Sequence, residues 1–392
     1  MPQLIELVEY EPRRLPSEAI SEEVARIIWL NHKNRIAIEP PSFRTDNQWE
    51  LTSYGYVGYL PITSDLTIAL RPKVPLRNLF GMLEYAYRLD IKFFDDLVGC
   101  DSLEDFYERL ANVLAKRLIE RQHKGLHRKY VQRSERSAFV RGRLNLIDRM
   151  RRPWAVLSQC EFEEHTAQIE DNEILAWTSR RIAQGGVCSE RVLPIVRRAY
   201  RGMNGINPAG PFTGSSCTRR AYTRLNADYK TLHSLCRFFL DKAGPTHQTG
   251  EYLMLPFLVD MNELFEQFVA EWLRAHMPQG YSLQVQSRFV ISGDYSLQFV
   301  IDLVIIEVAS GRVVYVLDTK YKRAQTPAAS DVEQITAYAE AKAANDAILV
   351  YPATMSVALD SFIGRIRVRS VTFSLDTDLE AAGTWFLNAV FG

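Results

Sequence analysis

The chain has 392 residues, too many for one ordinary hydrophobic core, so we expect two or three domains. Its 47% hydrophobic and 24% charged residues are typical of a globular protein, and 47 Lys and Arg balance 47 Asp and Glu. No apolar run reaches the roughly 18–20 residues of a membrane helix, the first residues do not resemble a signal peptide, and the five cysteines form no CxxC pair. We therefore expect a cytoplasmic protein with no membrane partner, disulfide framework or zinc knuckle.

Residues 1–100 are expected to form a strand-rich N-terminal domain. Residues 18–29 have helical periodicity with an acidic first turn, and a second helix is expected over 76–89. Short apolar runs broken by Pro, Gly and Asn predict strands within 34–40, 49–63 and 65–74. Glycines among the tyrosines of this region favour bent strands, as in a small barrel or a curled sheet.

Residues 101–245 are expected to be mostly helical and basic. Amphipathic patterns predict helices at 102–122, 169–183 and 220–241. Residues 116–152 hold 13 Lys or Arg against 3 acids, and residues 180–230 hold 10 against 2. Two basic blocks in one region can follow a phosphate backbone, although a solvated helical face is the simpler explanation of a charge run alone. The stretch 242–250, KAGPTHQTG, is the best linker in the chain.

Residues 250–392 are expected to form a separate α/β domain with the order α-β-β-β-α-β-β. Helices are predicted over 261–277 and 330–342, the second with Ser330 as its N-cap. Strands are predicted at 281–292, 295–307, 313–322, 346–353 and 366–375, with a turn at 292–296.

Two acids and a lysine interrupt the strands of this C-terminal region. Asp302 lies within the apolar run FVIDLVII, where a lone charge is costly unless it is paired or bound to a metal. Asp318 and Lys320, 16 and 18 residues later, share one face of a strand end in VLDTKYK. The spacing fits two adjacent antiparallel strands with both acids near one end, provided that the register puts them on one face.

Two neighbouring carboxylates repel each other unless a divalent cation neutralises them. Oxygen ligands without a His or Cys cluster favour Mg²⁺ over Zn²⁺, with Mn²⁺ able to substitute. Lys320 would then hold a water molecule or stabilise developing negative charge. If Asp318 and Lys320 are considered alone, a structural ion pair is the better explanation.

An acid followed by acid-x-Lys on successive strands resembles the PD-(D/E)xK nuclease pattern. Asp302 stands in the place of the first acid, and Asp318 and Lys320 stand in the place of D-x-K. The resemblance implies a restriction-endonuclease-like α/β domain and the activity of a metal-dependent endodeoxyribonuclease, a hydrolase. It also implies a glutamate on the preceding helix as a third metal ligand, with Glu266 the first candidate and Glu263 the second.

The helix after the D-x-K strand carries EQITAY, whose Gln334 and Tyr338 resemble the Q-x-x-x-Y element of the RecB-like branch. A longer likeness joins MNELFEQFV, IDLVI and VLDTKYK, which together resemble the McrC family, the nuclease subunit of McrBC methylcytosine-restriction systems in antiviral defence. GYVGYLPITSDLTIALRPKV and CEFEEHTAQIEDNEIL resemble the N-terminal and central parts of that family, so the likeness covers most of the chain. One departure is that the first acid follows Ile301 rather than Pro.

The McrC resemblance implies a division of labour with a hexameric McrB-like AAA+ GTPase. That partner reads modified DNA and translocates, while McrC inserts its N-terminal domain into the ring, stimulates GTP hydrolysis and cuts double-stranded DNA. The chain has no GxxxxGK[ST] loop, so it is expected to bind no nucleotide itself. A basic residue of the N-terminal domain acts near the partner's nucleotide in this family, and Arg71 and Lys73 are the candidates. A non-catalytic scaffold that activates the GTPase and a stand-alone RecB-like repair nuclease stay open as alternatives.

Overall fold

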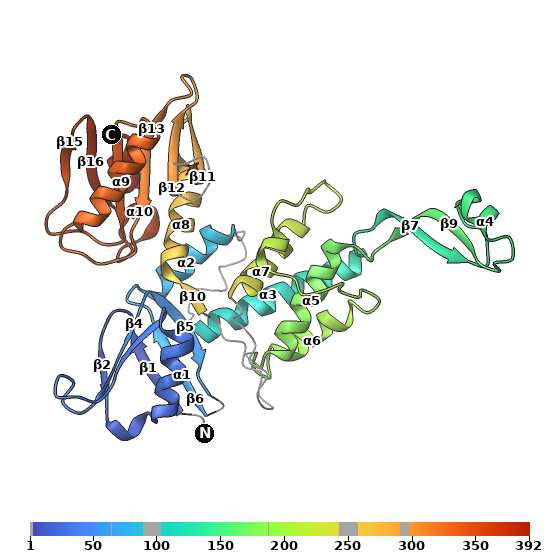
Figure 1. Cartoon of the computed structure of the whole chain (residues 1–392), viewed down its shortest axis with the longest axis horizontal. Coiled ribbons are helices and arrows are strands. Elements are labelled where there is room, and N and C mark those ends of the chain that lie inside the picture. The colour runs from blue at the N-terminus through green and yellow to red at the C-terminus, as the bar shows by residue number, and fades with distance from the viewer. Residues whose placement is uncertain (1–2, 64, 89–102, 187, 243–257, 291–297) are drawn as a thin grey trace. The chain divides into compact units, whose positions relative to one another are not determined.

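The computed structural model describes residues 3–63, 65–88, 103–186, 188–242, 258–290 and 298–392 (Figure 1). These residues form a mixed α/β protein with helices and four β-sheets. They divide into two compact units, of which the first holds the described residues of 1–106 and 258–392 and the second holds 107–241. The predicted domain boundaries near residues 100 and 250 lie outside the described residues and stay predictions, as do the linker over 243–250 and the turn at 292–296.

Two sheets form the N-terminal part of the first unit. Their strand orders are β1-β6-β5-β10 and β2-β4-β3. The bounds are β1 Gln3–Val8, β2 Arg13–Leu15, β3 Ile36–Glu39, β4 Trp49–Ser53, β5 Tyr56–Pro61, β6 Leu66–Arg71 and β10 Leu258–Asp260. The strands predicted within 34–40, 49–63 and 65–74 are confirmed. The parallel pairing of β1 with β6 and the contribution of β10 from late in the chain are features that the sequence pattern did not reveal.

Two α-helices accompany these sheets, α1 (Glu22–His32) and α2 (Leu76–Tyr87), with a short 3-10 turn, η1 (Ser17–Ala19), before α1. Both predicted helices of this region are confirmed. Ser21 caps α1 by accepting a hydrogen bond from the Val24 amide at 3.3 Å. Leu7, Ile28 and other buried apolar side chains of α1 and the sheets form a common core, which stabilises this part by removing apolar surface from water.

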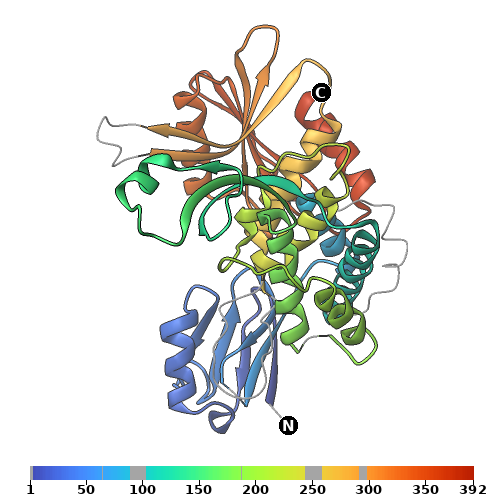
Figure 2. The ribbon, with the colours of Figure 1, turned by 90° about the vertical axis from the view of Figure 1, so that its right-hand side faces the viewer.

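The C-terminal part of the first unit is built on a six-stranded sheet with the order β11-β12-β13-β14-β16-β15. The strands are β11 Tyr281–Val290, β12 Gln298–Glu307, β13 Val313–Thr319, β14 Asp346–Tyr351, β15 Asp360–Ile363 and β16 Ile366–Thr372. Three helices, α8 (Met261–His276), α9 (Ala329–Ala341) and α10 (Leu379–Phe391), pack on it. Figure 2 shows α9 on one face of the sheet and α8 with α10 on the other.

The predicted helices and strands of this C-terminal part are confirmed, and β15 and α10 are elements that the sequence analysis missed. The predicted N-cap of α9 is wrong. The structure begins this helix at Ala329, with Ala328, two residues before Ser330, at the N-cap position and no side-chain cap bond. Ser330 therefore lies inside the first turn, where its hydroxyl cannot take the N-cap role.

The second unit contains α3 (Leu103–Lys124), α5 (Glu170–Gln184), α6 (Leu193–Arg201), α7 (Tyr229–Lys242) and a 3-10 turn, η4 (Gly214–Cys217). The helices predicted at 102–122 and 169–183 are confirmed, and the third, predicted at 220–241, starts later, at Tyr229. The unit is less purely helical than expected, because β7 (Lys129–Ser137), β8 (Arg143–Leu144) and β9 (Ser158–Thr166) form a sheet with the order β7-β9-β8. This sheet and α4 (Leu146–Arg151) extend from the helices as an arm, residues 129–166 (Figure 1).

Candidate active site

The pairing of β12 with β13 decides whether the two predicted acids meet. The register shifts by one residue next to Ile305, and beyond the shift Leu303 pairs with Leu317. Continuing that register by one residue sets Asp302 opposite Asp318, on the same face of the sheet. Nearer the turn, Ile306 pairs with Val313. If that register continued to the strand ends, Asp302 and Asp318 would lie on opposite faces of the sheet. An irregularity in the hairpin thus brings them together.

Hydrogen bonds from Thr319 fix the carboxylate of Asp302 beside the end of β13. The backbone amide and the hydroxyl of Thr319 donate to Asp302 Oδ2 at 2.9 and 3.0 Å. Thr319 is the middle residue of the Asp-x-Lys motif, so the first acid is held directly against that motif.

Lys320 links the acids to helix α9. Its Nζ lies 2.6 Å from Asp318 Oδ2 and donates to Gln334 Oε1 at 3.0 Å. The amide nitrogen of Gln334 donates in turn to the Tyr338 hydroxyl at 2.6 Å. Gln334 and Tyr338 are four residues apart, so both side chains lie on one face of the helix. The structure therefore joins four of the predicted site residues in one continuous chain of polar contacts.

Helix α8 carries the two candidate glutamates, and the structure distinguishes them. Glu266 accepts a hydrogen bond from Gln286 of β11. Glu263 is exposed and accepts at 2.9 Å from Gln267, one turn further along its own helix. Asp260 caps the start of α8 by accepting from the amides of Asn262 and Glu263, which fixes the helix where it leaves β10.

The electrostatics tie Glu266, rather than Glu263, to the two aspartates. Burial, and then the charge of Asp302, raises the pKa of Glu266 to about 7. Burial, and then Asp302, also raises the pKa of Asp318 to about 6, against the opposing effect of Lys320. Burial works to lower the pKa of Lys320, but the Asp318 carboxylate outweighs it, so the net pKa is raised and the ammonium stays charged. Carboxyl groups with raised pKa values beside a retained cation are a feature of functional sites.

A divalent cation suits the oxygen atoms gathered here. Asp318 is 3% exposed, and the only partner of its Oδ2 among the described residues is the Lys320 ammonium at 2.6 Å. Across the described part of the chain, no three His, Cys, Asp or Glu side chains are arranged as a complete metal site. Mg²⁺ usually takes one or two carboxylates and completes its shell with water and phosphate oxygens, so the two aspartates fit it without a third ligand.

Gln286 is a residue of this site that the sequence analysis missed. Gln286 lies within β11 but has a left-handed backbone, with φ of 53°. It stands opposite Asp302, at the position where the pairing of β11 with β12 is interrupted. A non-glycine residue in this region is strained, and such strain is concentrated at functional sites. No local sequence signal marks Gln286, because the strain arises from the pairing of the strands.

Asp331 was also missed. It is 7% exposed, near the start of α9, and it accepts from the Tyr351 hydroxyl at 3.1 Å and pairs with Lys322 Nζ at 2.5 Å. Its charge acts on both Asp318 and Lys320. The available signal was its position three residues before Gln334, on the same side of the helix.

Arg71 and Lys73, the candidates for action on a partner's nucleotide, lie at the end of β6 and just beyond it. Arg71 pairs with Glu6 of β1 at 2.6 Å, and Lys73 pairs with Glu11 at 3.3 Å. The backbone amide of Lys73 also donates to Glu9 at 3.0 Å. The role predicted for these two residues stays a prediction.

The basic block at 116–152 continues from α3 into the arm, where large apolar side chains are exposed as well. Six of them are at least 68% exposed: Tyr130, Phe139, Val140, Met150, Trp154 and Val156. Several exposed apolar side chains on one projecting segment are typical of a contact with another macromolecule. None of the helices in the described part of the chain has the length and hydropathy that a membrane crossing requires.

Comparison with known families decides the affiliation of the chain. Residues 51–352 match the family model described as McrBC 5-methylcytosine restriction system component. This match covers well over half of the sequence. The chain belongs to this McrBC family. A search of curated proteins gave no match.

A solved structure shares the fold of this McrBC-family chain. A chain from the assembly of Thermococcus gammatolerans McrB AAA+ hexamers with bound McrC is 18% identical, with 99% of each chain covered and a TM-score of 0.58. A second match, from the structure of the Thermococcus gammatolerans McrBC complex, is 21% identical, covers 71% of this chain and 89% of that one, and has a TM-score of 0.45. The first match shows that the fold extends over the whole chain.

Proposed function

We propose that this chain is the DNA-cleaving subunit of an McrBC-like, modification-dependent restriction complex, with a PD-(D/E)xK nuclease site in its C-terminal part. The observation that carries the proposal is the convergence of Asp302, Asp318 and Lys320 with Gln334 of α9. The order of these residues along the chain and their contacts both match what the nuclease resemblance implies. Membership of the McrBC family supports the same conclusion.

The proposed roles follow from the contacts. Asp302 and Asp318 offer carboxylate oxygens to Mg²⁺ or Mn²⁺, and the cation supplies a Lewis acid that polarises the scissile phosphate when it is bound. Lys320, held between Asp318 and Gln334, directs its ammonium to the negative charge that develops on the phosphate. Tyr338 orients Gln334, which in turn limits the positions that Lys320 can adopt.

Glu266 is the proposed third carboxylate. Its pKa of about 7 means that this carboxyl group is protonated in about half of the molecules near neutral pH. A cation at the aspartates would favour the ionised form, because opposite charge lowers the pKa of a carboxyl group. In the absence of a cation, the hydrogen bond from Gln286 holds the Glu266 carboxyl group in place.

The proposed partner is an McrB-like AAA+ GTPase hexamer, and the proposed substrate is double-stranded DNA that contains a modified cytosine. The similar solved assembly is one of McrB AAA+ hexamers with bound McrC. The exposed apolar residues of the arm suit a protein partner, and the lysines and arginines of 116–152 suit a phosphate backbone.

A matched pair of aspartate variants tests the nuclease proposal. Asp318→Asn keeps the side-chain volume but removes the charge, so we expect cleavage of 5-methylcytosine-containing plasmid DNA to fall by roughly 10³-fold or more. The measurement uses the full chain with its AAA+ partner, GTP and Mg²⁺. Asp360→Asn removes an exposed acid of β15, paired with Arg367, and is expected to leave cleavage unchanged.

Stimulation of the partner's GTPase serves as the internal control, because it should survive in both variants. Cleavage by the Asp318→Asn complex at the wild-type rate would show that the site is assigned wrongly. Intact GTPase stimulation by a wild-type chain that neither binds Mn²⁺ nor cuts DNA would instead identify a non-catalytic activator. Cutting by the isolated wild-type chain would identify a stand-alone nuclease.

A further inference from the structure

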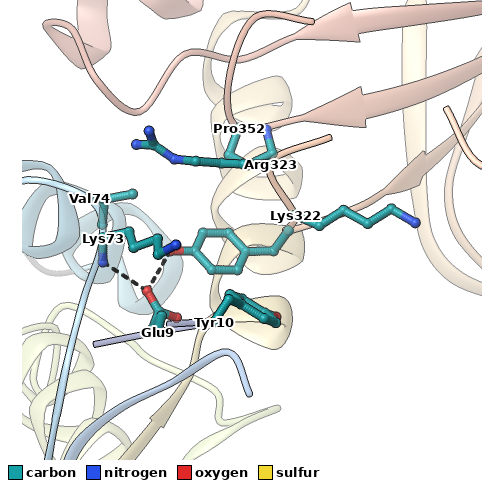
Figure 3. A pocket seen from close by; sticks show the side chains of 8 residues that line it. Glu9, Tyr10, Lys73, Val74, Lys322, Arg323 and Pro352 are labelled. Atoms are coloured by element: carbon teal, nitrogen blue, oxygen red, sulfur yellow. Dashed lines mark hydrogen bonds between the residues drawn. The ribbon is translucent and has the colours of Figure 1, made fainter. Parts of the chain in front are cut away.

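A buried glutamate of the N-terminal sheet is bonded to the segment that follows the Asp-x-Lys motif. Glu9, at the end of β1, is completely buried. Its Oε2 accepts from the Tyr321 hydroxyl at 3.1 Å and from the Lys73 backbone amide at 3.0 Å (Figure 3). Tyr321 is the residue directly after Lys320. One carboxyl group thus joins the N-terminal sheet to the strand end that holds the proposed catalytic lysine.

Tyr321 also contacts the helix that carries the third carboxylate. Its side chain is 7% exposed, and its ring lies 6.0 Å from the ring of Phe265, measured between centroids. Phe265 precedes Glu266 on α8. The Tyr321 side chain therefore lies between the backbone of Lys320 and the helix turn that presents Glu266, and a shift of this ring would disturb both.

The backbone on either side of Lys320 is held as well. The Lys320 amide donates to the Val350 carbonyl at 2.8 Å, and the Lys322 amide donates to the Lys320 carbonyl at the same distance. The chain therefore makes a tight turn immediately after the Asp-x-Lys motif. The direction in which it leaves this turn is fixed by the anchoring of the Tyr321 hydroxyl.

Packing alone does not hold the Tyr321 hydroxyl in place, because a cavity of about 290 Å³ lies beside its hydrogen bond to Glu9. The residues that line this cavity include Glu9, Tyr10, Lys73 and Tyr321. Figure 3 shows Lys73 beside Glu9 and Lys322 extending away from it. The three cations that line the cavity already pair with acids: Lys73 with Glu11, Lys322 with Asp331 and Arg323 with Asp376. Open space on this side leaves the Tyr321 hydroxyl free to shift once its bond to Glu9 is lost.

We propose that Glu9 and Tyr321 are positioning residues for DNA cleavage, whose hydrogen bond sets Lys320 and Glu266 at the distances that the reaction requires. The proposal rests on the proposed nuclease function. Neither residue touches the acids or the lysine with a side-chain polar bond, so both act through the backbone and the ring contact. The consequence is that the N-terminal sheet helps to complete a site built by the C-terminal sheet.

The test compares three variants of Glu9 and Tyr321. Each is assayed as the full chain with its AAA+ partner, GTP, Mg²⁺ and 5-methylcytosine-containing plasmid DNA. Tyr321→Phe removes the hydroxyl and keeps the ring on Phe265. Glu9→Gln keeps an oxygen that accepts from Tyr321, whereas Glu9→Leu removes it. Tyr85→Phe is the matched control, because the Tyr85 hydroxyl donates to Glu380 at 2.8 Å in the same unit, away from the motif.

We expect Tyr321→Phe to lower kcat roughly tenfold, because small misplacements of catalytic groups slow a reaction strongly, with KM for DNA unchanged. Glu9→Leu should lower kcat at least as much, and Glu9→Gln should retain most of the wild-type kcat. Both Tyr321→Phe and Tyr85→Phe should stay fully folded at the assay temperature, as checked by their melting temperatures, so that a merely structural role for the Tyr321 hydroxyl would leave the kcat of Tyr321→Phe close to that of Tyr85→Phe. If Glu9→Leu fails to fold, Tyr321→Phe and Glu9→Gln still decide the question.

The proposal is overturned if Tyr321→Phe cleaves like Tyr85→Phe, or if Glu9→Gln loses as much kcat as Tyr321→Phe does. Those outcomes leave the nuclease proposal standing as long as the wild type cuts and Asp318→Asn does not. Wild-type inactivity, or cleavage by Asp318→Asn, overturns the nuclease proposal itself and the positioning roles with it.

Discussion

The carboxyl groups of Asp318 and Glu9 are buried in the first unit, where an ordinary core would exclude a charge. Asp318 has a raised pKa because burial and Asp302 oppose its charge, and Glu9 has a pKa of about 7 because burial dominates over its hydrogen bonds to Lys73 and Tyr321. Glu9 Oε1 also has no hydrogen-bond partner. Groups of this kind reduce stability when they are ionised, so their presence is better explained by function than by packing.

Glu9 gives the stability of the first unit a pH dependence of known sign. Its pKa rises from 4.5 to about 7 on folding, so the folded chain binds the proton more tightly than the unfolded chain. The stabilisation is therefore complete below about pH 4.5 and is lost as the pH rises through about 7, by roughly 3 kcal/mol in all. The charged and titratable groups that face Glu9 are Lys73, Arg323, Tyr10 and Tyr321.

Urea unfolding of wild type and Glu9→Gln at about pH 5 and about pH 8 measures this effect. The variant cannot titrate at this position, so its loss of stability between the two pH values should be smaller than that of the wild type. Equal pH dependence in the two proteins would show that Glu9 is not protonated on folding.

Sequence and structure agree best on residues whose chemistry is local. Asp302, Asp318 and Lys320 stand out because charges interrupt apolar runs, and the spacing of the acids suggested paired strands. Glu9 and Gln286 could not be found in this way. The bond from Glu9 to Tyr321 spans 312 positions, and the left-handed backbone of Gln286 is a product of strand pairing.

Among elements, the almost fully buried strands of the C-terminal sheet were predictable, whereas β7 was not, and β1 and β9 were missed although each has buried apolar side chains. β14 is buried over almost its whole length and its position was predicted, whereas β7 is polar and largely exposed and is held by its pairing with β9. The register shift between β12 and β13 is equally invisible in the sequence, although the facing of the two acids depends on it. Strand existence follows from local pattern, but register follows from the whole hairpin.

The packing of α10 on α8 makes Gly383 a sensitive position. A Cβ atom at Gly383 would meet the ring of Trp272 at 1.9 Å, and this ring is only 1% exposed and has little room to move. Gly383→Ala should therefore destabilise the first unit by about 1–3 kcal/mol through overpacking, measured as a lower melting temperature.

Gly81→Ala in α2 is the matched control for this prediction. Its Cβ would meet the tip of the Leu379 side chain, which can rotate away, and alanine is favoured over glycine inside a helix. A melting temperature for Gly383→Ala that is no lower than that of Gly81→Ala would contradict the described contact between α8 and α10.

At the scale of the whole molecule, the first unit is assembled from both ends of the sequence. β10 completes the N-terminal sheet by pairing with β5 and leads directly into α8, which carries Glu266. Asn78 of α2 donates to the carbonyls of Leu375 and Thr377, both at 2.8 Å. The region that the McrC resemblance assigns to the partner and the region that holds the proposed nuclease site are therefore one packed body, while the basic arm belongs to the second unit.

In the proposed nuclease, Asp302 and Asp318 together bind a divalent cation at the site of DNA cleavage. Anomalous diffraction from crystals of the full chain with a DNA duplex and Mn²⁺ tests it most directly. We predict an Mn²⁺ peak within about 2.0–2.6 Å of an oxygen from each aspartate, with a DNA phosphate completing the coordination. Bound DNA with no peak between these two carboxylates, or with the cation held by other residues, would show that Asp302 and Asp318 are not the metal ligands.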